Sequence, residues 1–378
     1  MAEQASPFKP GFSRVPAVLA GREQVLAAFD ETIALAAVDR KTPPPLILVG
    51  ARGVSKSVLL EELATRAAAE HGWPRLHVEV GGTRDFMNAL GEAALHTPAL
   101  LTQTPAAKRR MRTSEAVLRA HVAGIGGELH LRPEDASPSQ TSAMDALRAA
   151  LALAAERQSG ITLTLDEAHM LPRNQLNELG ALLQEASRER WPVVVAVAGL
   201  QSLRSSGRTP TYFEWADWWP LGMLSDAATL QAICEPAKEA GRPFHEAAAR
   251  RLAAATGGYP YAIQLYGHHA WRAARGNRID EGAVQRTELL AAAQLERGLF
   301  AQRWAQASGR EREYLLALAE ELQAQGTATG GAVARRLGVT TKQVASYRAR
   351  LIEKGTLVAD GESLSFVVPG MASYVMRA

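Results

Sequence analysis

Short apolar runs and stretches with helical spacing alternate along the first 200 residues. Buried strands are predicted at four apolar runs: 46–50, 75–80, 161–165 and 192–199. Helices are predicted where apolar positions recur every three or four residues: at about 22–37, 56–70, 86–94, 144–157 and 175–188. Strands that alternate with helices of this length indicate a mostly parallel sheet covered by helices on both faces. The predicted fold class is α/β.

Two stretches of this part break the pattern. Residues 1–20 are proline-rich and are predicted to lie in an extended form on the first domain. Residues 96–142 show no clear periodicity and are predicted to be a surface insertion, with a small hairpin around Gly124–Gly127. The insertion also holds a basic run, KRRMR, at 108–112.

The remainder of the chain is predicted to be mainly helical. Helices are expected near 225–239, 244–256 and 260–275, within a helical region that extends to about 303. From 308 onward, three short helical segments precede two short strands around Asp360–Gly361. That order is the layout of a winged helix-turn-helix, with Gly338 in the turn and the recognition helix starting at Thr341.

Composition narrows the class of protein. The 378 residues are 47% hydrophobic and 21% charged, and the longest apolar runs fall far short of a membrane span. The first residues lack the apolar stretch of a secretory signal. A single cysteine, Cys234, excludes an internal disulfide framework and fits a reducing cytosol. We therefore expect a cytoplasmic protein without a membrane partner.

The segment GARGVSKS at 50–57 is close to a phosphate-binding P-loop, G-x-x-x-x-G-K-[ST]. A predicted strand precedes it and a predicted helix follows, as that loop requires. Lys56 would reach the β- and γ-phosphates, and the Ser57 hydroxyl would ligate Mg²⁺. The backbone of the loop and of the first helical turn would cradle the phosphates, which involves Gly50, Gly53, Val54, Ser55 and Val58.

The strand ITLTL at 161–165 is followed at once by two acids. Asp166 would hold Mg²⁺, and Glu167 would polarise the attacking water. Two acids at the start of a helix are also common without any catalytic role. Because Lys56 of the P-loop lies 110 residues before Asp166 (166 − 56), we favour the interpretation that the two acids belong to a nucleotide site.

The order of P-loop, strand ending in Asp-Glu and further strand ending in AGLQSL resembles the AAA+ and STAND ATPases. It is most similar to bacterial ATPases related to archaeal-type and origin-recognition-type proteins. The resemblance implies ATP or ADP with Mg²⁺ as cofactors and a P-loop core at 1–222. It also implies a helical lid at 223–305 and a winged helix at 306–378. Three more stretches support the resemblance, and each implies site residues. Gly21 and Arg22 of AVLAGREQVLAAF would lie beside the adenine. Gln201 would be the sensor 1 residue, and Pro260 would contact the nucleotide from the lid.

Two departures from the family pattern bear on ATP hydrolysis. Ser55 stands where the last glycine of the P-loop is expected. If the backbone there has a positive φ, a serine adds strain of about 1–3 kcal/mol. No arginine finger is clear, because Glu214 is followed by Trp215; Arg204 and Arg208 are nearby alternatives. Whether the chain is an active ATP hydrolase is therefore left open at this stage, and turnover is expected to be slow.

Basic residues gather in the predicted winged helix. Six of them lie between Val333 and Lys354, against the single acid Glu353. The residues expected to face phosphates and base edges of double-stranded DNA are Lys342, Gln343, Ser346, Arg348 and Arg350. Winged helices also dock proteins, and that alternative stays open.

Two functions follow from these patterns. The first is an ATP-controlled DNA-binding switch. The alternative is a poorly hydrolysing nucleotide-binding adaptor whose winged helix docks a protein, in regulation, mobile-element maintenance or defence. Self-association is compatible with either.

Overall fold

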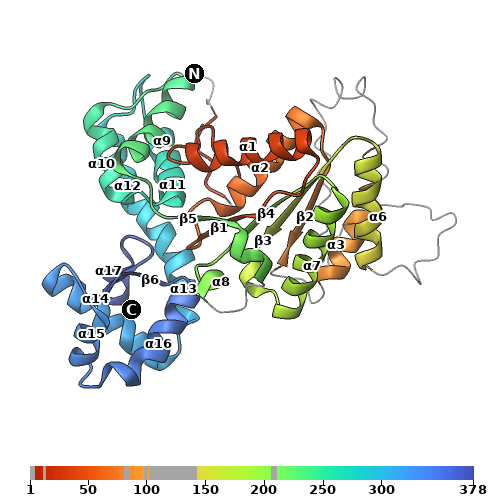
Figure 1. The fold of residues 1–378 in the computed structure, drawn as a ribbon. Helices are drawn as coiled ribbons and strands as arrows, with labels where there is room; N and C mark the ends of the chain where they lie inside the picture. Colours follow the sequence, from red (N-terminus) through yellow and green to blue (C-terminus); the bar gives the residue numbers. More distant parts are fainter. Residues whose placement is uncertain (1–4, 12–13, 81–85, 98–100, 102–142, 206–210) are drawn as a thin grey trace, which may run out of the picture.

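The central sheet has five strands, all parallel, in the order β2-β3-β4-β1-β5 (Figure 1). The computed structural model of the protein describes residues 5–11, 14–80, 86–97, 101, 143–205 and 211–378. The predicted hairpin at 124–127, the basic run at 108–112 and most of the predicted insertion lie outside these residues. The strands are β1 (Leu46–Gly50), β2 (Arg75–Glu79), β3 (Ile161–Asp166), β4 (Val193–Gly199) and β5 (Asp217–Leu221).

Helices cover both faces of this sheet. One face carries α1 (Glu23–Asp39) and α2 (Lys56–His71); the other carries α3 (Phe86–Leu95), α6 (Ala143–Glu156) and α7 (Arg173–Glu189) (Figure 1). Every residue of β1, β3 and β4 is buried, which explains their unbroken apolar runs. The α/β fold class and the P-loop core are confirmed.

Strand β5 has no counterpart among the predicted elements. It is an edge strand that pairs only with β1 among the described strands, and its first four residues are half-buried or exposed. Trp218 packs with the core on the α3, α6 and α7 side, and Trp219 packs with the core on the other side. An edge strand is wetted along one side and lacks the continuous apolar run of a central strand.

The second half of the molecule is helical. It begins with α9 (Asp226–Glu239), α10 (Glu246–Thr256), α11 (Pro260–Ala273) and α12 (Glu281–Leu295). A π-helical turn, η5 (Glu296–Phe300), then runs directly into α13 (Ala301–Ala305). Ser225 and Asp280 cap α9 and α12 by accepting backbone N–H bonds, as helix starts require.

The last part of the chain, residues 309–378, is called the C-terminal region below. It contains α14 (Gly309–Gln325), α15 (Gly330–Arg336) and α16 (Thr341–Glu353), followed by an antiparallel pair of β6 (Leu357–Asp360) and β7 (Ser363–Phe366). These elements appear in the predicted order. A short final helix, α17 (Met371–Val375), was not predicted.

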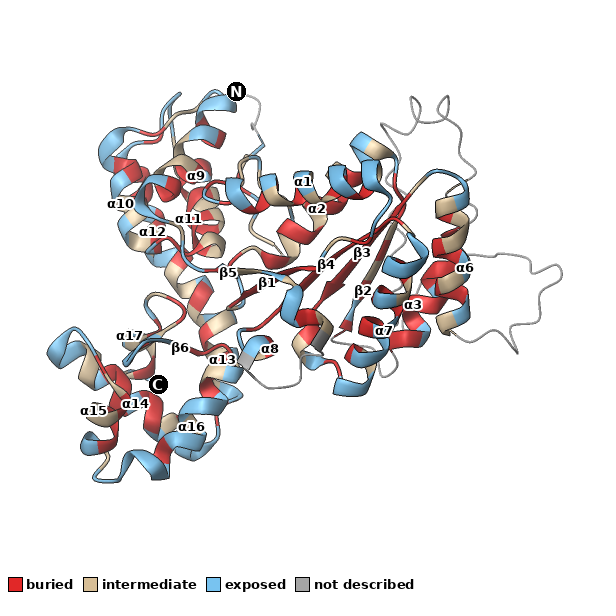
Figure 2. Ribbon diagram, in the orientation of Figure 1, coloured by how far each residue is buried: buried red, intermediate tan, exposed pale blue. Residues whose placement is uncertain are grey.

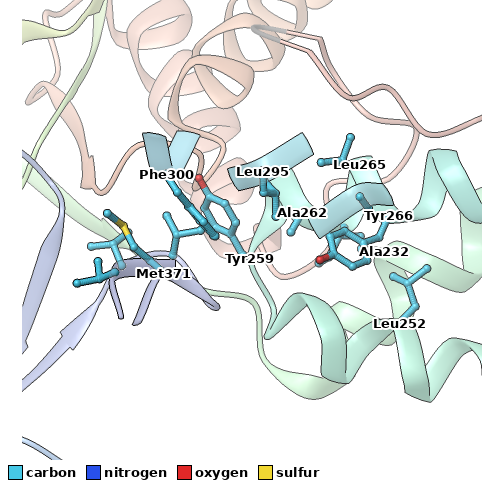
Figure 3. Close-up of a cluster of buried hydrophobic side chains, with 14 of the residues drawn as sticks. Ala232, Leu252, Tyr259, Ala262, Leu265, Tyr266, Leu295, Phe300 and Met371 are labelled. Atoms are coloured by element: carbon cyan, nitrogen blue, oxygen red, sulfur yellow. The ribbon is translucent and has the colours of Figure 1, made fainter. Parts of the chain in front are cut away.

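One buried cluster joins α9–α12 to the C-terminal region. Tyr259, Phe300 and Met371, which come from three separate parts of the chain, lie close together in it (Figure 3). Phe8 of the N-terminal segment belongs to the same cluster and packs so closely on α11 that a Cβ at Gly267 would lie 2.5 Å from its ring. The N-terminal segment thus packs partly on α11, and not only on the first domain as the sequence predicted.

Among the described residues, no helix combines the length and the apolarity needed to cross a membrane.

Candidate nucleotide site

The loop between β1 and α2 has the shape that a phosphate-binding turn needs. Gly53 has φ +84°, and a Cβ at Gly50 would lie 2.3 Å from the Leu221 carbonyl oxygen, so neither position accepts a larger residue without a shift. Lys56 begins α2 and is 6% exposed. Its Nζ donates to the carbonyl oxygens of Gly50 at 2.9 Å and Ala51 at 2.7 Å. The amine is therefore held inside the loop.

Burial dominates the electrostatics of Lys56. It lowers the pKa of the amine to about 8, although the nearby carboxylates of Glu167 and Asp166 raise it in part. A buried cation in a loop of this kind is ready to pair with phosphate.

Ser55 occupies the left-handed region, with φ +77° and ψ +20°. The condition left open from the sequence, a positive φ at this position, is thus met, and the serine carries backbone strain of about 1–2 kcal/mol. Its side chain makes no capping hydrogen bond to α2 that would offset the strain.

The carboxylates after β3 lie beside the loop. Asp166 is 7% exposed, and its Oδ1 accepts a hydrogen bond from the Glu167 N–H at 2.8 Å. Glu167 itself has φ +56°, which turns its side chain out of the strand direction. Its Oε2 lies 3.5 Å from Nη2 of Arg52 and 3.4 Å from Nε2 of His169. Both contacts are ion-pair distances too long for strong hydrogen bonds.

His169 is a site residue that the sequence analysis missed. The Leu200 N–H donates to its Nδ1 at 3.3 Å, which assigns the proton of the neutral ring to Nε2, the nitrogen facing Glu167. Burial, with added repulsion from Arg52 and Lys56, lowers the pKa of His169 to about 4. The ring is therefore neutral at physiological pH and can orient the Glu167 carboxylate.

A cavity of about 550 Å³ opens from the loop, within the range typical of small-ligand sites. Its cationic end is formed by the P-loop and the start of α2. Its other end lies between the N-terminal segment and the helices that follow the sheet, where apolar side chains are joined by Lys9 and Arg14 of the N-terminal segment. The main lining residues of the apolar end are Val18, Leu19, Ala20, Leu224, Ala232, Pro260 and Ile263.

Arg22 and Gly21 support the cavity in different ways. Arg22 lines it, but its Nη2 donates to the backbone carbonyls of Gly222 at 2.8 Å and Val54 at 3.3 Å. It ties three segments together, and burial lowers its pKa. Gly21 does not line the cavity; it has φ +67°, and a Cβ there would lie 2.9 Å from the Ala228 Cβ. Both positions shape the site through the backbone.

Tyr259 was also missed, although it directly precedes the predicted Pro260. Its hydroxyl donates to the Arg52 carbonyl oxygen at 3.0 Å, and a Cβ at Gly53 would lie 2.0 Å from that hydroxyl. Tyr259 is 1% exposed, and burial raises its pKa to about 12. Figure 3 shows it beside Phe300, which precedes α13. The start of α11 is thereby locked against the phosphate loop.

The remaining predicted residues divide clearly. Ser57, Val58 and Pro260 line the cavity, and Val54 is buried in the loop beneath it. Gln201 and Arg204 are exposed and are absent from the cavity lining; the Arg204 guanidinium lies 5.5 Å from the Trp218 ring centre.

The predicted DNA-contacting residues lie on α16, most of which is exposed (Figure 2). Lys342, Ser346 and Arg348 are exposed. Gln343 caps its own helix by accepting from the Thr340 N–H at 2.8 Å. Arg350 donates to Glu311 at 3.1 Å, so this side chain is held within the C-terminal region. Two of the five predicted contacts are therefore already engaged.

The loop, the two acids and the cavity define the class of a P-loop nucleotide-binding protein. Residues 18–196 match the family described as the AAA ATPase domain, and residues 297–375 match a domain of unknown function (DUF8462). This part of the chain is therefore similar to AAA ATPase domains, which agrees with the P-loop core described above. A search of curated proteins found no match.

Solved structures extend the likeness in fold to nearly the whole chain. A Walker-type ATPase of Pyrococcus abyssi is 15% identical with a TM-score of 0.65, covering 94% of this chain and 96% of that chain. The ORC2 protein of Aeropyrum pernix is 14% identical, with a TM-score of 0.58 and coverage of 97% and 95%. Cdc6p from Pyrobaculum aerophilum is 16% identical, with a TM-score of 0.53 and the same coverage. The resemblance to origin-recognition-type ATPases is confirmed at the level of fold.

Proposed function

We propose that the protein is an ATP-binding switch that engages double-stranded DNA through α16. The observation that carries nucleotide binding is the cavity itself, which has the P-loop at one end and apolar side chains, with Lys9 and Arg14 beside them, at the end where a base would lie. In this proposal Val18, Leu19 and Ile263 contact the base, while Lys56 and the loop N–H groups hold the phosphates. The Aeropyrum pernix ORC2 structure was solved as ADPNP and ADP complexes, which supports the choice of adenine nucleotide.

The side chains present fit Mg²⁺ bound together with the nucleotide. Mg²⁺ prefers one or two protein oxygens together with phosphate oxygens and water. Ser57 lines the cavity. Asp166 does not line it, but its buried carboxylate lies close enough to Lys56 to raise the pKa of that amine, so these two would hold the ion. Among the described residues, no group of three His, Cys, Asp or Glu side chains could hold a metal ion by itself.

Hydrolysis is proposed to be slow. Glu167 is the candidate to polarise water, but its Oε2 has no hydrogen-bond partner among the described residues, and it lies between Arg52 at 3.5 Å and His169 at 3.4 Å. The strain at Ser55 weakens the loop that must hold the phosphates. Gln201 and Arg204 line no part of the cavity, so any role in turnover requires a rearrangement or a second protomer.

The C-terminal region contacts the site edge directly, which supports its control by nucleotide. A Cβ at Gly355, just after α16, would lie 3.4 Å from the Leu200 side chain. The Leu200 N–H is the group that bonds His169, and His169 faces Glu167. If Glu167 moves when nucleotide binds, the movement can therefore reach the end of α16 through His169 and Leu200.

The DNA face is smaller than the sequence suggested. Of the six basic residues at 333–354, Arg336 pairs with Glu321, and Arg350 and Lys354 pair with Glu311. Arg335, Lys342 and Arg348 are exposed and have no ion pair among the described residues. These three are the proposed phosphate-contacting residues: Lys342 and Arg348 lie on α16 together with Ser346, and Arg335 lies on α15.

The nucleotide proposal is tested by calorimetry of Mg·ATP and Mg·ADP on the natural chain and on Ser55→Gly. We expect the natural chain to bind with a Kd on the order of micromolar, and Ser55→Gly to bind more tightly. Absence of binding by both proteins would sink the proposal. Binding by the glycine variant alone would mean that Ser55 prevents nucleotide binding, and that the natural protein functions in a nucleotide-free state.

The DNA proposal is tested by titrating duplex DNA at several salt concentrations. The double variant Lys342→Ala with Arg348→Ala should bind more weakly, and the slope of log K against log salt should fall by about 1.8. The charge-matched control is Arg275→Ala with Arg278→Ala, since both residues are exposed before α12. Equal binding by all three proteins would instead favour the adaptor, for which exposed Val339 and Val358 offer apolar contacts.

A further inference from the structure

Gln264, on α11, lines the end of the cavity away from the P-loop, which is called the base end below. Pro260, Ile263 and Gln264 are spaced i, i+3 and i+4, so they share one face of the helix, and all three line the cavity. Gly267 continues this face by one turn, and there the ring of Phe8 packs against the helix. One face of α11 thus forms a cavity wall and also contacts the N-terminal segment.

A single hydrogen bond fixes the orientation of the Gln264 amide. The Lys9 N–H donates to Oε1 of Gln264 at 3.0 Å. Because a backbone N–H can only donate, the atom that faces it has to be the carbonyl oxygen of the amide. The amide nitrogen, which carries two N–H donors, has no hydrogen-bond partner among the described residues. It is therefore the polar group that Gln264 offers to a ligand in the cavity.

The cations at the base end can also only donate. Lys9 and Arg14 line this end, and the Lys9 amine already donates to the Val15 carbonyl oxygen at 3.3 Å. Among the described residues that line the cavity, the only carboxylate is that of Glu167, which lies beside the P-loop. A planar base between the apolar side chains of this end would therefore meet N–H donors and no carboxylate.

Adenine and guanine present opposite groups at ring position N1. Adenine N1 is an acceptor, whereas guanine carries an N–H donor there, next to a second donor, its N2 amino group. An amide nitrogen that faces this edge pairs with adenine, but it places donor against donor with guanine. Polar groups that stay unpaired in a binding site lower affinity, and a site built around such a pair rejects the base that cannot form it.

We infer that Gln264 recognises the base of the bound nucleotide: its amide nitrogen donates to N1 of adenine and thereby disfavours guanine. The inference rests on the proposed nucleotide binding and adds the residue that sets the base specificity. The bond from the Lys9 N–H keeps the amide in this orientation, so the N-terminal segment positions the donor without contacting N1 itself.

The test measures Mg·ATP and Mg·GTP affinities by calorimetry for three proteins. The natural chain should bind ATP more tightly than GTP. Gln264→Glu keeps an oxygen for the Lys9 N–H but replaces the donor by an acceptor, so its ATP affinity and its ratio of ATP to GTP affinity should both fall at least about 10-fold. The matched control is Gln294→Glu, which adds the same charge on α12 outside the cavity lining and should bind both ligands like the natural chain.

A base analogue tests the same contact without any change to the protein. In 1-deaza-ATP a C–H group replaces N1, so the natural chain should bind this analogue about 10-fold more weakly than ATP. Gln264→Glu, which has lost the donor, should bind the analogue no more weakly than it binds ATP. The result for the natural chain decides the inference even if the variant does not fold.

Equal binding of ATP and 1-deaza-ATP by the natural chain would overturn the inference while the proposed function stands. An equal loss of ATP and GTP affinity in Gln264→Glu would overturn it too, because the side chain would then act only through its contact with the N-terminal segment or through its charge. If the natural chain bound neither ATP nor GTP, the proposed function and this inference would fall together.

Discussion

Two regions of this molecule bury charge, and they treat it in opposite ways. In the C-terminal region, Glu311 is 1% exposed and accepts bonds from Arg350 at 3.1 Å, Lys354 at 2.8 Å and the Ser308 N–H at 2.8 Å. At the phosphate loop, Lys56 bonds only backbone carbonyls, and the terminal nitrogens of Arg303 bond nothing in the described chain. Removing one partner of a paired buried charge destabilises a fold strongly, whereas a buried charge without a partner lowers stability as long as no opposite charge reaches it.

The largest effect is expected when the loop loses its cation. Lys56→Met should lower ATP affinity at least about 100-fold, because the amine is the side chain positioned to reach the β- and γ-phosphates. Its folding stability should change little, since a buried amine held only by carbonyls contributes less than it costs to desolvate. Calorimetry and denaturant unfolding measure the two quantities on the same sample. A variant that kept its ATP affinity would show that the cavity binds something else.

Glu311 provides the opposite case. Glu311→Gln keeps the side-chain shape but removes the charge that Arg350 and Lys354 share, and the free energy of unfolding should fall by about 2 kcal/mol. The loss is limited because both cations are partly exposed and can be hydrated again. Nucleotide affinity should be unchanged. The matched control is Glu313→Gln, whose pair with Arg310 is exposed on the same helix, so the free energy of unfolding should stay close to that of the natural chain.

Acid should reveal the same ion pairs. Burial alone would raise the pKa of Glu311, but bonds from Lys354, the Ser308 N–H and Arg350 outweigh it and lower the pKa to about 2. An ordinary glutamate in the unfolded chain titrates near 4.3. The stabilisation is therefore complete above about pH 5 and is lost as the pH falls toward 2. Unfolding free energies measured across this window should decline less steeply in Glu311→Gln; parallel curves would contradict the assignment.

This contrast also shows how far the sequence could lead. The strand, loop and helix around GARGVSKS follow from local patterns, and so do Lys56, Ser57 and Asp166, because one short segment carries both the turn and its chemistry. The positive φ at Ser55, which the sequence left as a condition, belongs to the same short segment. The order of elements in the C-terminal region was equally readable from helical spacing and turns.

The missed residues depend on contacts between distant segments. Tyr259 reaches a loop 207 residues away, and Arg303 comes from a helix that continues α12 without a break. Nothing in LFAQRWAQ distinguishes that arginine from an exposed one. The pairing of Arg350 with Glu311 likewise spans 39 residues, which is why Arg350 was assigned to DNA. The domain boundaries and the DNA-facing role of α16 stay predictions.

Arg303 allows the comparison to be tested without any ligand. In the absence of nucleotide, Arg303→Met should raise the free energy of unfolding by about 1 kcal/mol, because an apolar side chain of similar length replaces an unpaired buried cation. The sign is opposite to that expected for Glu311→Gln. Denaturant unfolding of both variants beside the natural chain measures it. If both variants lose stability to the same extent, Arg303 has an internal partner, and the two regions do not differ as described.

The smallest effect is expected from relieving the backbone strain at Ser55 in the phosphate loop. Ser55→Gly should relieve about 1 kcal/mol of strain at φ +77°, but glycine gains about as much entropy in the unfolded chain, so net stability should change by less than about 0.5 kcal/mol. The entropy of the unfolded chain does not affect nucleotide binding by the folded protein. If the natural loop has to change shape to bind phosphate, the nucleotide affinity of Ser55→Gly should therefore rise up to about fivefold. Arg40→Gly is the control, because Arg40 has φ +50° in an exposed position at the end of α1. It should relieve similar strain without changing affinity. An unchanged affinity in Ser55→Gly would mean that the loop already holds its phosphate-binding shape, and that the cations alone limit binding.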